Sequence, residues 1–347
     1  MEPAGSGLSM VASSSALLSV QDLQVQYWSD RGPVRAVDGV SLEIGEGEVF
    51  GLAGESGSGK STIAMAIMRL LHPPAEITGG RVFLDGTDLL EADDASLQDL
   101  RWRAVSMVFQ SAMNGLNPVM RVGDQIVDVI VAHEHVRANQ ARQRAVELLG
   151  LTGIEAGRSR SYPHELSGGM RQRAMIAMAL ALHPRLIIMD EPTTGLDVVV
   201  QREIMDQIQE LRTKLGFSIL FITHDLSLLL EICSRAAVMY AGKIVETGPV
   251  DQLFTRPVHP YSEGLMSCFP SIVGERRKLM GIVGAPPDMA RPPSGCRFHP
   301  RCPYALEKCR EVLPPLVEVA PERMAACHLS EERLAQHERS LSAGTPR

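Results

Sequence analysis

One nine-residue loop, 54–62, restricts the fold of this 347-residue chain more than any other feature. It reads Gly54-Glu55-Ser56-Gly57-Ser58-Gly59-Lys60-Ser61-Thr62 and fits the pattern G-x-x-x-x-G-K-[ST] in full. In loops of this kind the glycines let backbone N–H groups surround phosphate oxygens, the lysine reaches the outer phosphates, and the hydroxyl that follows can ligate Mg²⁺. The loop therefore predicts a phosphate-binding site in which Lys60 and Ser61 supply the principal side chains.

The segments around the loop predict an α/β fold with a parallel sheet. An apolar strand at 48–53 precedes the loop, and residues 61–71 have helical periodicity. Buried strands and helices then alternate, which is typical of a parallel sheet. The further strands are 105–109, 186–189 and 219–223, and the helices are 141–149, 170–182 and 199–215. We also expect an antiparallel pair at the start, 18–27 with 34–44, and a closing hairpin, 236–240 with 243–246.

Two carboxylates, Asp190 and Glu191, follow the apolar run Leu186–Met189 directly. The carboxyl ends of parallel strands face the ligand crevice, so these acids should lie beside the phosphate loop. We expect Asp190 to hold Mg²⁺, directly or through water, and Glu191 to polarise an attacking water. Alone, the pair is also compatible with a solvated strand end. Gln110 and His224 each end another predicted strand, and neither is informative by itself.

The segment 166–173 is more specific. It reads Leu-Ser-Gly-Gly-Met-Arg-Gln-Arg, and its Ser167, Gly168 and Gly169 open a predicted helix, which makes a second anion-binding helix start. The ordered set of motifs comprises the loop 54–62, Gln110, this segment, Asp190-Glu191, Thr194-Gly195-Leu196-Asp197 and His224. With these motifs, residues 17–255 resemble an ATP-binding cassette (ABC) ATPase. The resemblance implies a P-loop core with an antiparallel β subdomain and a helical signature subdomain at about 111–182.

The resemblance also implies how such a site works. Two subunits would sandwich two ATP molecules head to tail, with the loop of one facing the Ser167–Met170 signature of the other. Tyr27 would stack on adenine, and Gln110 would contact Mg²⁺ and sense the membrane partner. Asp197 would lie in the loop that crosses the dimer interface. His224 would grip the γ-phosphate while Glu191 activates water, a mechanism of positioning and charge neutralisation.

Two residues depart from the commonest family pattern. Met170 stands where Gln is usual in the signature, and Gly195 stands where Ala is usual before Leu-Asp. The anion contacts of the signature come from Ser167 and backbone N–H groups, so we expect Met170 to be harmless. The departure leaves open whether the two sites of a dimer are equivalent.

Two short segments resemble the oligopeptide/dipeptide importer branch of the family. They are Tyr162-Pro163-His164-Glu165, before the signature, and His259-Pro260-Tyr261, just after the cassette. That branch also includes nickel importers and, in some organisms, sugar importers. The resemblance implies two permease subunits, a second ABC ATPase as heterodimer partner and a solute-binding protein.

Four of the six cysteines lie in the last fifth of the chain, with the spacing Cys296-x5-Cys302-x6-Cys309-x17-Cys327. Four thiolates can hold an iron–sulfur cluster or a tetrahedral Zn²⁺. The tight C-x2-C pairs usual in zinc folds are absent. The spacing resembles the [4Fe–4S] element of one of the two ATPases in peptide importers, with zinc, free thiols or a disulfide as alternatives. His299 and His328 adjoin this set and could replace a ligand, whereas Cys233 and Cys268 are expected to be inert.

Composition sets the remaining expectations. A net charge of −7 without a dense basic block argues against nucleic-acid binding. The longest apolar stretch, 174–182, is nine residues, far short of the ~20 of a spanning helix. We expect a disordered leader at 1–16, the cassette at 17–255, a Pro- and Cys-rich C-terminal domain at 256–329 and a tail at 330–347. The chain would work at the cytoplasmic face of the membrane as a peripheral subunit.

Two other functions of ABC ATPases fit this sequence less well than transport. Soluble ABC ATPases of translation usually carry two cassettes, and those of DNA repair carry long insertions, whereas this chain has one cassette and a short span between Gly59 and Ser167. A non-catalytic cassette would be expected to lack Lys60, Glu191 or His224, and all three are present.

Overall fold

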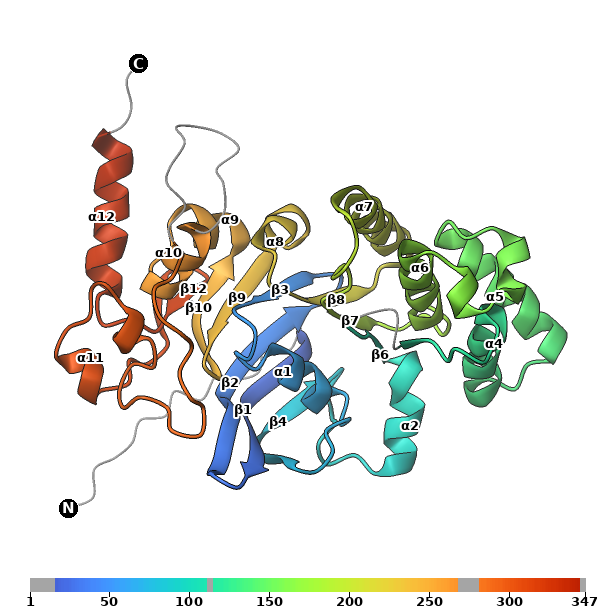
Figure 1. Ribbon diagram of the computed structural model, residues 1–347, viewed down its shortest axis with the longest axis horizontal. Coiled ribbons are helices and arrows are strands. Elements are labelled where there is room, and N and C mark those ends of the chain that lie inside the picture. The colour runs from blue at the N-terminus through green and yellow to red at the C-terminus, as the bar shows by residue number, and fades with distance from the viewer. Residues whose placement is uncertain (1–15, 111–114, 268–280, 344–347) are drawn as a thin grey trace.

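The computed structural model describes residues 16–110, 115–267 and 281–343. Its strands form a four-stranded sheet of order β2-β1-β4-β5 and an eight-stranded sheet of order β11-β12-β10-β9-β3-β8-β7-β6. Figure 1 shows the eight-stranded sheet running through the middle of the molecule, with the four-stranded sheet and α1 below it and α7 and α8 above it. The strand β3, which leads into the phosphate loop, is therefore central.

The strands of both sheets have these bounds. The four-stranded sheet contains β1 (Ala16–Ser29), β2 (Gly32–Gly45), β4 (Ala75–Leu84) and β5 (Thr87–Asp88). The eight-stranded sheet contains β3 (Val49–Ala53), β6 (Val105–Val108), β7 (Leu186–Asp190), β8 (Ser218–Thr223), β9 (Arg235–Tyr240), β10 (Lys243–Pro249), β11 (Val317–Ala320) and β12 (Arg323–Ala325). Neighbours from β6 to β9 run parallel, and β9 to β11 continue antiparallel.

The helices surround this framework. The α-helices are α1 (Lys60–Ile67), α2 (Asp94–Arg103), α4 (Val122–His133), α5 (Ala138–Leu151), α6 (Gly168–Ala179), α7 (Val198–Leu215), α8 (Leu226–Ile232), α9 (Val250–Thr255), α10 (Pro260–Ser267), α11 (Lys308–Glu311) and α12 (Ser330–Ala343). The described ranges also contain three short 3₁₀ helices, η1 (Ala156–Arg160), η2 (Pro163–Glu165) and η3 (His299–Arg301). Figure 1 places α4, α5 and α6 at one end of the molecule and α11 and α12 at the other.

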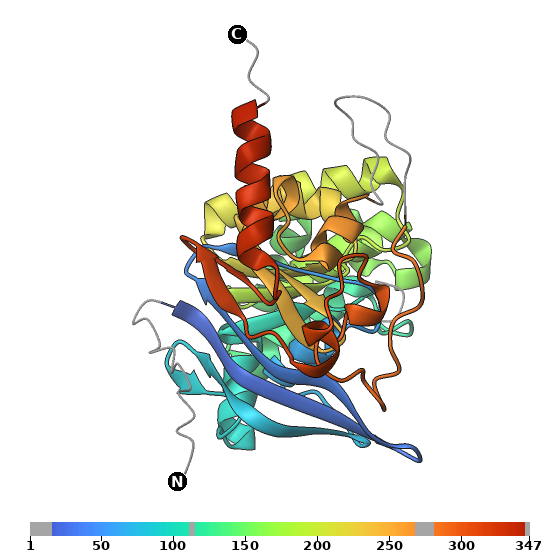
Figure 2. The ribbon, with the colours of Figure 1, turned by 90° about the vertical axis from the view of Figure 1, so that its left-hand side faces the viewer.

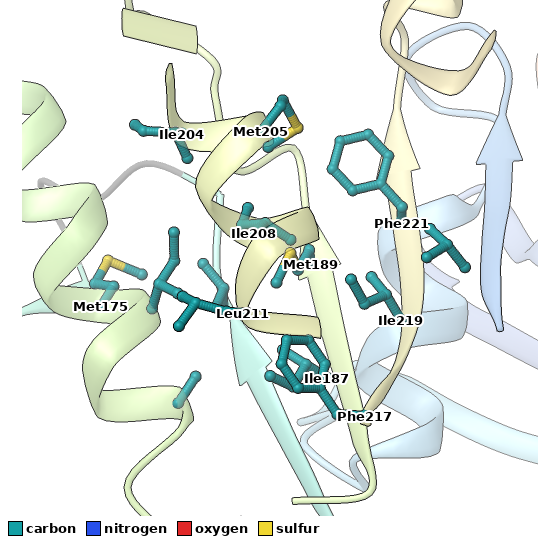
Figure 3. Packing of buried hydrophobic residues seen from close by; sticks show 14 of the residues in the cluster. Met175, Ile187, Met189, Ile204, Met205, Ile208, Leu211, Phe217, Ile219 and Phe221 are labelled. Carbon is teal, nitrogen blue, oxygen red and sulfur yellow. The ribbon is translucent and has the colours of Figure 1, made fainter. Parts of the chain in front are cut away.

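Alternation along the buried strands divides the core in two. In β7, Ile187 and Met189 join the cluster under α6 and α7, whereas Leu186 and Ile188 join the cluster around α1 and the four-stranded sheet. Successive strand residues point to opposite faces, so a strand covered on both sides reads as one apolar run. Figure 3 shows the first cluster, in which one stripe of α7 packs on β7 and β8; its α7 members are Ile204, Met205, Ile208 and Leu211.

The expected mixed α/β fold is confirmed, with the parallel sheet, the antiparallel pair and the helical region in place. Several expected segments lie partly or wholly outside the described residues: the leader up to residue 15, residues 111–114, Cys268 and the last residues of the tail. In the described part of the chain, no helix is both long and apolar enough to cross a membrane.

The C-terminal segment, described at 256–267 and 281–343, is joined to the rest of the chain through the main sheet. Strand β12 pairs with β10, so the segment extends the main sheet instead of forming a separate layer. Arg323 of β12 donates to Glu246 of β10 at 2.8 Å, and both side chains are almost completely buried. Figure 2 shows the same segment lying against the end of the sheet, with α12 rising away from it.

Candidate functional site

The phosphate loop leaves β3 at Gly54 and enters α1 at Lys60. Gly54 and Gly59 have φ values of 150° and 107°, and a Cβ at either position would lie 2.2 Å from a backbone oxygen of Met239 or Ala36. These positions therefore require glycine both for backbone conformation and for space. Because α1 starts at the end of the loop, its free N–H groups point into the loop.

Lys60 is buried, with its ammonium inside the loop. Its Nζ donates to the carbonyl oxygens of Gly54 and Glu55, at 2.7 and 3.0 Å. Burial lowers the pKa of Lys60, while the nearby carboxylates of Glu191 and Asp190 act in the opposite direction. The cation is thus surrounded by weak acceptors that an anion could replace.

Asp190 and Ser61 form the second part of the site. Ser61 Oγ donates to Asp190 Oδ1 at 3.1 Å, which joins the start of α1 to the end of β7. Burial raises the pKa of Asp190, so a cation beside this carboxylate would favour its charged form. A carboxylate and a hydroxyl are oxygen donors of the kind that Mg²⁺ prefers, and the pair fits that ion.

Glu191 is held by three side chains. Gln110 Nε2 and Thr194 Oγ1 donate to its Oε2 at 2.8 and 3.0 Å, and His224 Nδ1 lies 3.1 Å from its Oε1. Its backbone has φ 47°, in the left-handed region, and its N–H donates to Ile222 O at 2.8 Å. A non-glycine residue in that region is strained, and such strain persists only where the surroundings determine it. Gln110, Glu191 and His224, predicted from separate strand ends, are therefore brought together.

Tyr27 lies on β1 at the far end of the loop. Its hydroxyl is 3.5 Å from Thr62 Oγ1, and its ring is partly exposed. The structure thus places this aromatic ring next to the loop, on the side of the antiparallel sheet.

The signature residues are not brought to the loop of the same chain. Ser167 caps α6, where its Oγ accepts from Met170 N at 3.3 Å, and Ser167 and Gly168 are exposed. Asp197 caps α7 in the same way, accepting from Val200 N at 3.0 Å. In Figure 1, α6 and α1 lie well apart along the sheet. A ligand bound to the phosphate loop would therefore not contact the start of α6 in the same chain.

The four C-terminal cysteines line one small cavity together with His299 and His328. The described cysteines are free of disulfide bonds, and burial raises the pKa of Cys296, of Cys302 and of Cys327, the last to about 11. Each histidine uses one ring nitrogen on a backbone carbonyl, of Cys296 or Val312. Within the described ranges, no three His, Cys, Asp or Glu side chains form a group that could hold a metal ion. The four thiols therefore share a cavity without being drawn together as a ligand set in the described chain.

Three side chains at the site were not predicted to act there. Thr194 was named only as part of a motif, yet it donates to Glu191. Tyr261 and Arg301, from the C-terminal segment, both contact Glu55 of the loop. The triplet His259-Pro260-Tyr261 was the available signal for Tyr261, whereas Arg301 carried none.

Comparison with known families decides what this arrangement belongs to. The family "ABC transporter" matches residues 37–194, and "Oligopeptide/dipeptide transporter, C-terminal region" matches residues 245–309. The oligopeptide transport ATP-binding protein AppD of Bacillus subtilis is 44% identical over 325 residues, which cover 93% of this chain and 99% of AppD. This chain belongs to the ATP-binding proteins of ABC transporters. It is an ABC ATPase of the type that has the oligopeptide/dipeptide C-terminal region.

Other relatives agree with this assignment of the ABC ATPase. The dipeptide transport ATP-binding protein DppD of Escherichia coli is 42% identical over 315 residues, covering 90% of this chain and 96% of DppD. A solved dimeric ATP-binding cassette, bound to ADP and phosphate after hydrolysis, superposes with a TM-score of 0.61 at 28% identity. That match covers 67% of this chain and 98% of the solved one. A solved protein from Clostridium perfringens, part of an ABC transporter complex, superposes with a TM-score of 0.60 at 29% identity. That match covers 70% of this chain and 91% of the solved one.

Proposed function

We propose that this ABC ATPase powers the uptake of dipeptides and oligopeptides. The observation that carries the proposal is the match to AppD at 44% identity over nearly the whole of both chains. Other relatives, OppD and DppD of Escherichia coli, are also named for oligopeptide or dipeptide transport. Because the C-terminal region matches as well as the cassette, the likeness is not confined to motifs that all ABC ATPases share.

The loop would bind the triphosphate of ATP. Backbone N–H groups of the loop, other than that of Glu55, which donates to Tyr261, would face the phosphate oxygens together with the start of α1, and Lys60 would exchange its carbonyl acceptors for the outer phosphates. Tyr27 would stack on the adenine, since it lies beside Thr62 at the end of the loop. Binding therefore uses groups that the loop and β1 already bring together.

Ser61, Asp190 and Gln110 would hold Mg²⁺. Bound there, the ion would neutralise negative charge on the phosphates. Ser61 and Asp190 are already within hydrogen-bond distance of each other, and Gln110 reaches the same region through Glu191. Burial raises the pKa of Asp190, and a cation bound beside it would stabilise the charged carboxylate.

Glu191 would orient the attacking water and accept its proton. Gln110, Thr194 and His224 fix the carboxylate from three directions, which is the preorganisation that a general base needs. The side chain of His224 is largely exposed, and only its Nδ1 faces Glu191. Its Nε2 would contact the γ-phosphate. The lysine, the histidine and the metal would share the developing charge on the phosphoryl group.

The separation of the loop from the signature supports a two-subunit site. The signature of a second, homologous ATPase would complete the site on this chain, while Ser167, Gly168 and Gly169 of this chain would complete the site on the partner, and Asp197 would lie at the interface. We propose a heterodimer that works with two permease subunits and a solute-binding protein at the cytoplasmic face of the membrane. The division into a cassette at 17–255 with a helical subdomain near 111–182, and a C-terminal domain at 256–329, belongs to the same proposal.

We also propose that Cys296, Cys302, Cys309 and Cys327 hold a [4Fe–4S] cluster. All four thiols line one cavity and none is in a disulfide, so they are available as ligands, but they would have to move closer together to hold the cluster. The test is anaerobic purification followed by iron and sulfide analysis and absorption spectroscopy. We expect a brown protein with about four iron atoms per chain; a colourless sample with stoichiometric zinc, or with no metal, would contradict the cluster.

Transport by the assembled complex tests the proposed substrate. This chain would be reconstituted with its permeases, the second ATPase and the binding protein in vesicles, and uptake of a labelled tripeptide would be compared with uptake of Ni²⁺ or a labelled sugar. We expect ATP-dependent peptide uptake that disappears when this chain is omitted. Uptake of nickel or sugar without peptide uptake would contradict the proposal.

A further inference from the structure

The C-terminal segment contacts the second residue of the phosphate loop from two sides. The backbone N–H of Glu55 donates to Tyr261 Oη at 2.8 Å, and the carboxylate of Glu55 accepts two hydrogen bonds from Arg301, at 2.8 and 3.1 Å. We propose that Tyr261 and Arg301 are positioning residues that fix the conformation of the loop and so set its affinity for ATP. The inference rests on the proposed role of the loop and adds a means by which the C-terminal segment controls it.

The Arg301–Glu55 pair is built to hold a fixed geometry. Each terminal guanidinium nitrogen of Arg301 donates to a different carboxylate oxygen of Glu55. Paired bonds of this kind restrain orientation as well as distance. Only 7% of the Arg301 side chain and 25% of the Glu55 side chain is exposed. Arg301 also donates to Tyr240 Oη at 3.3 Å and to Val283 O at 3.1 Å, so its own position is determined.

Tyr261 provides a second fixed point. Its ring is fully buried and packs against Tyr240 and Phe298, with ring centroids 4.5 and 5.4 Å apart. Its backbone N–H donates to His259 Nδ1 at 3.0 Å, and the N–H of His259 donates to buried Glu246 at 2.8 Å. The hydroxyl is therefore connected to β10 of the main sheet through a chain of buried groups.

The loop needs such support because its own residues restrain it weakly. Glycine occupies three of its positions with positive φ, and glycine is the most flexible residue in an unfolded or mobile segment. Lys60 now holds the carbonyls of Gly54 and Glu55, but it must leave them to reach a phosphate. The bonds from Tyr261 and Arg301 do not involve Lys60, so they would keep Glu55 in place after that change. A loop already in its binding conformation binds with higher apparent affinity.

The test measures binding of MgATP to the full-length chain and hydrolysis by the assembled transporter. Tyr261→Phe removes one oxygen and keeps the packed ring, so it preserves the fold. Arg301→Ala removes the charge pair. We expect roughly a five-fold rise in the Kd for ATP with Tyr261→Phe and about ten-fold or more with Arg301→Ala. The KM for ATP should rise in parallel while kcat at saturating ATP is nearly unchanged.

Arg333→Ala is the matched control. Arg333 lies in the same segment, is almost as buried and pairs with Glu263 at 2.7 Å, but it does not contact the loop. We expect this variant to lose thermal stability and to keep the wild-type Kd. A second check compares the double variant Glu55→Gln/Arg301→Ala with each single variant. The double variant should weaken ATP binding no more than the more affected single variant does, because the two substitutions remove the same interaction.

Three results would overturn the proposal. They are a wild-type Kd in both Tyr261→Phe and Arg301→Ala, an equal loss of affinity in Arg333→Ala, or a loss confined to kcat. Failure of peptide uptake by the wild-type complex would instead count against the proposed substrate, because the affinity measurement uses ATP alone.

Discussion

Lys60 is the residue whose replacement tests the loop most simply. It is the cation inside the loop, and the acceptors that it now uses are neutral carbonyl oxygens. Lys60→Ala should raise the Kd for ATP by roughly 10- to 100-fold, the range expected when a hydrogen bond to a charged group is lost. Titration with a fluorescent ATP analogue measures the change. Lys214→Ala, on an exposed helical pair with Glu210, is the control and should bind like the wild type. Unchanged affinity in Lys60→Ala would contradict the assigned role.

The residues of the site were predictable where each follows a strand within a short motif. Gln110, Glu191 and His224 each end a different predicted strand, and the parallel order of β6, β7 and β8 brings them together. The strand end alone indicated a role only for Glu191, whereas the roles of Gln110 and His224 came from the resemblance to ABC ATPases. Contacts between the cassette and the C-terminal segment were not predictable. Arg301 lies 246 residues after Glu55, and nothing in the local sequence specifies that pairing.

At the scale of elements, strand β12 depends on one buried ion pair. Arg323 and Glu246 are 1% and 0% exposed, and Glu246 also accepts from the N–H groups of Val258 and His259. Removing one partner of a buried pair leaves an uncompensated charge and costs about 3–5 kcal/mol. Arg323→Ala should lower the free energy of unfolding by this amount and increase amide exchange in β10 and β12. Denaturant titration and hydrogen exchange measure the two effects.

The control for Arg323→Ala is a charge pair at the surface. Arg185 contacts Glu46 and Asp85, and all three side chains are exposed. Exposed pairs contribute about 0–1 kcal/mol, so Arg185→Ala should change stability little. Equal losses in the two variants would show that burial of the pair does not matter.

Elements with a strong apolar pattern were predicted well, and short elements were not. Strands β3, β7 and β8 are buried on both faces, and their apolar runs mark them in the sequence. Strands β11 and β12 have four and three residues, and β11 is mostly exposed or half-buried. Their strand conformation comes from the pairing of β12 with β10 and of β11 with β12, and the contact with β10 is a tertiary one that no local pattern encodes.

At the scale of the whole molecule, the phosphate loop and the signature lie on different parts of the surface. If a second subunit supplies the missing signature, a variant that binds ATP but cannot hydrolyse it should hold the two subunits together around the bound ATP. Glu191→Gln keeps the shape of the side chain and removes the base. In the assembled complex it should bind ATP without turning it over, so that ATP stays bound at this site after gel filtration. Release of ADP at the wild-type rate would contradict the role of Glu191.

We propose that hydrolysis of ATP by this chain drives uptake through its membrane partners. ATP hydrolysis and labelled-peptide uptake would be measured in the same reconstituted vesicles, with the wild-type chain or with Glu191→Gln. We expect Glu191→Gln to abolish peptide uptake and to lower hydrolysis at this site by at least about 100-fold. Peptide uptake at the wild-type rate with Glu191→Gln would contradict it.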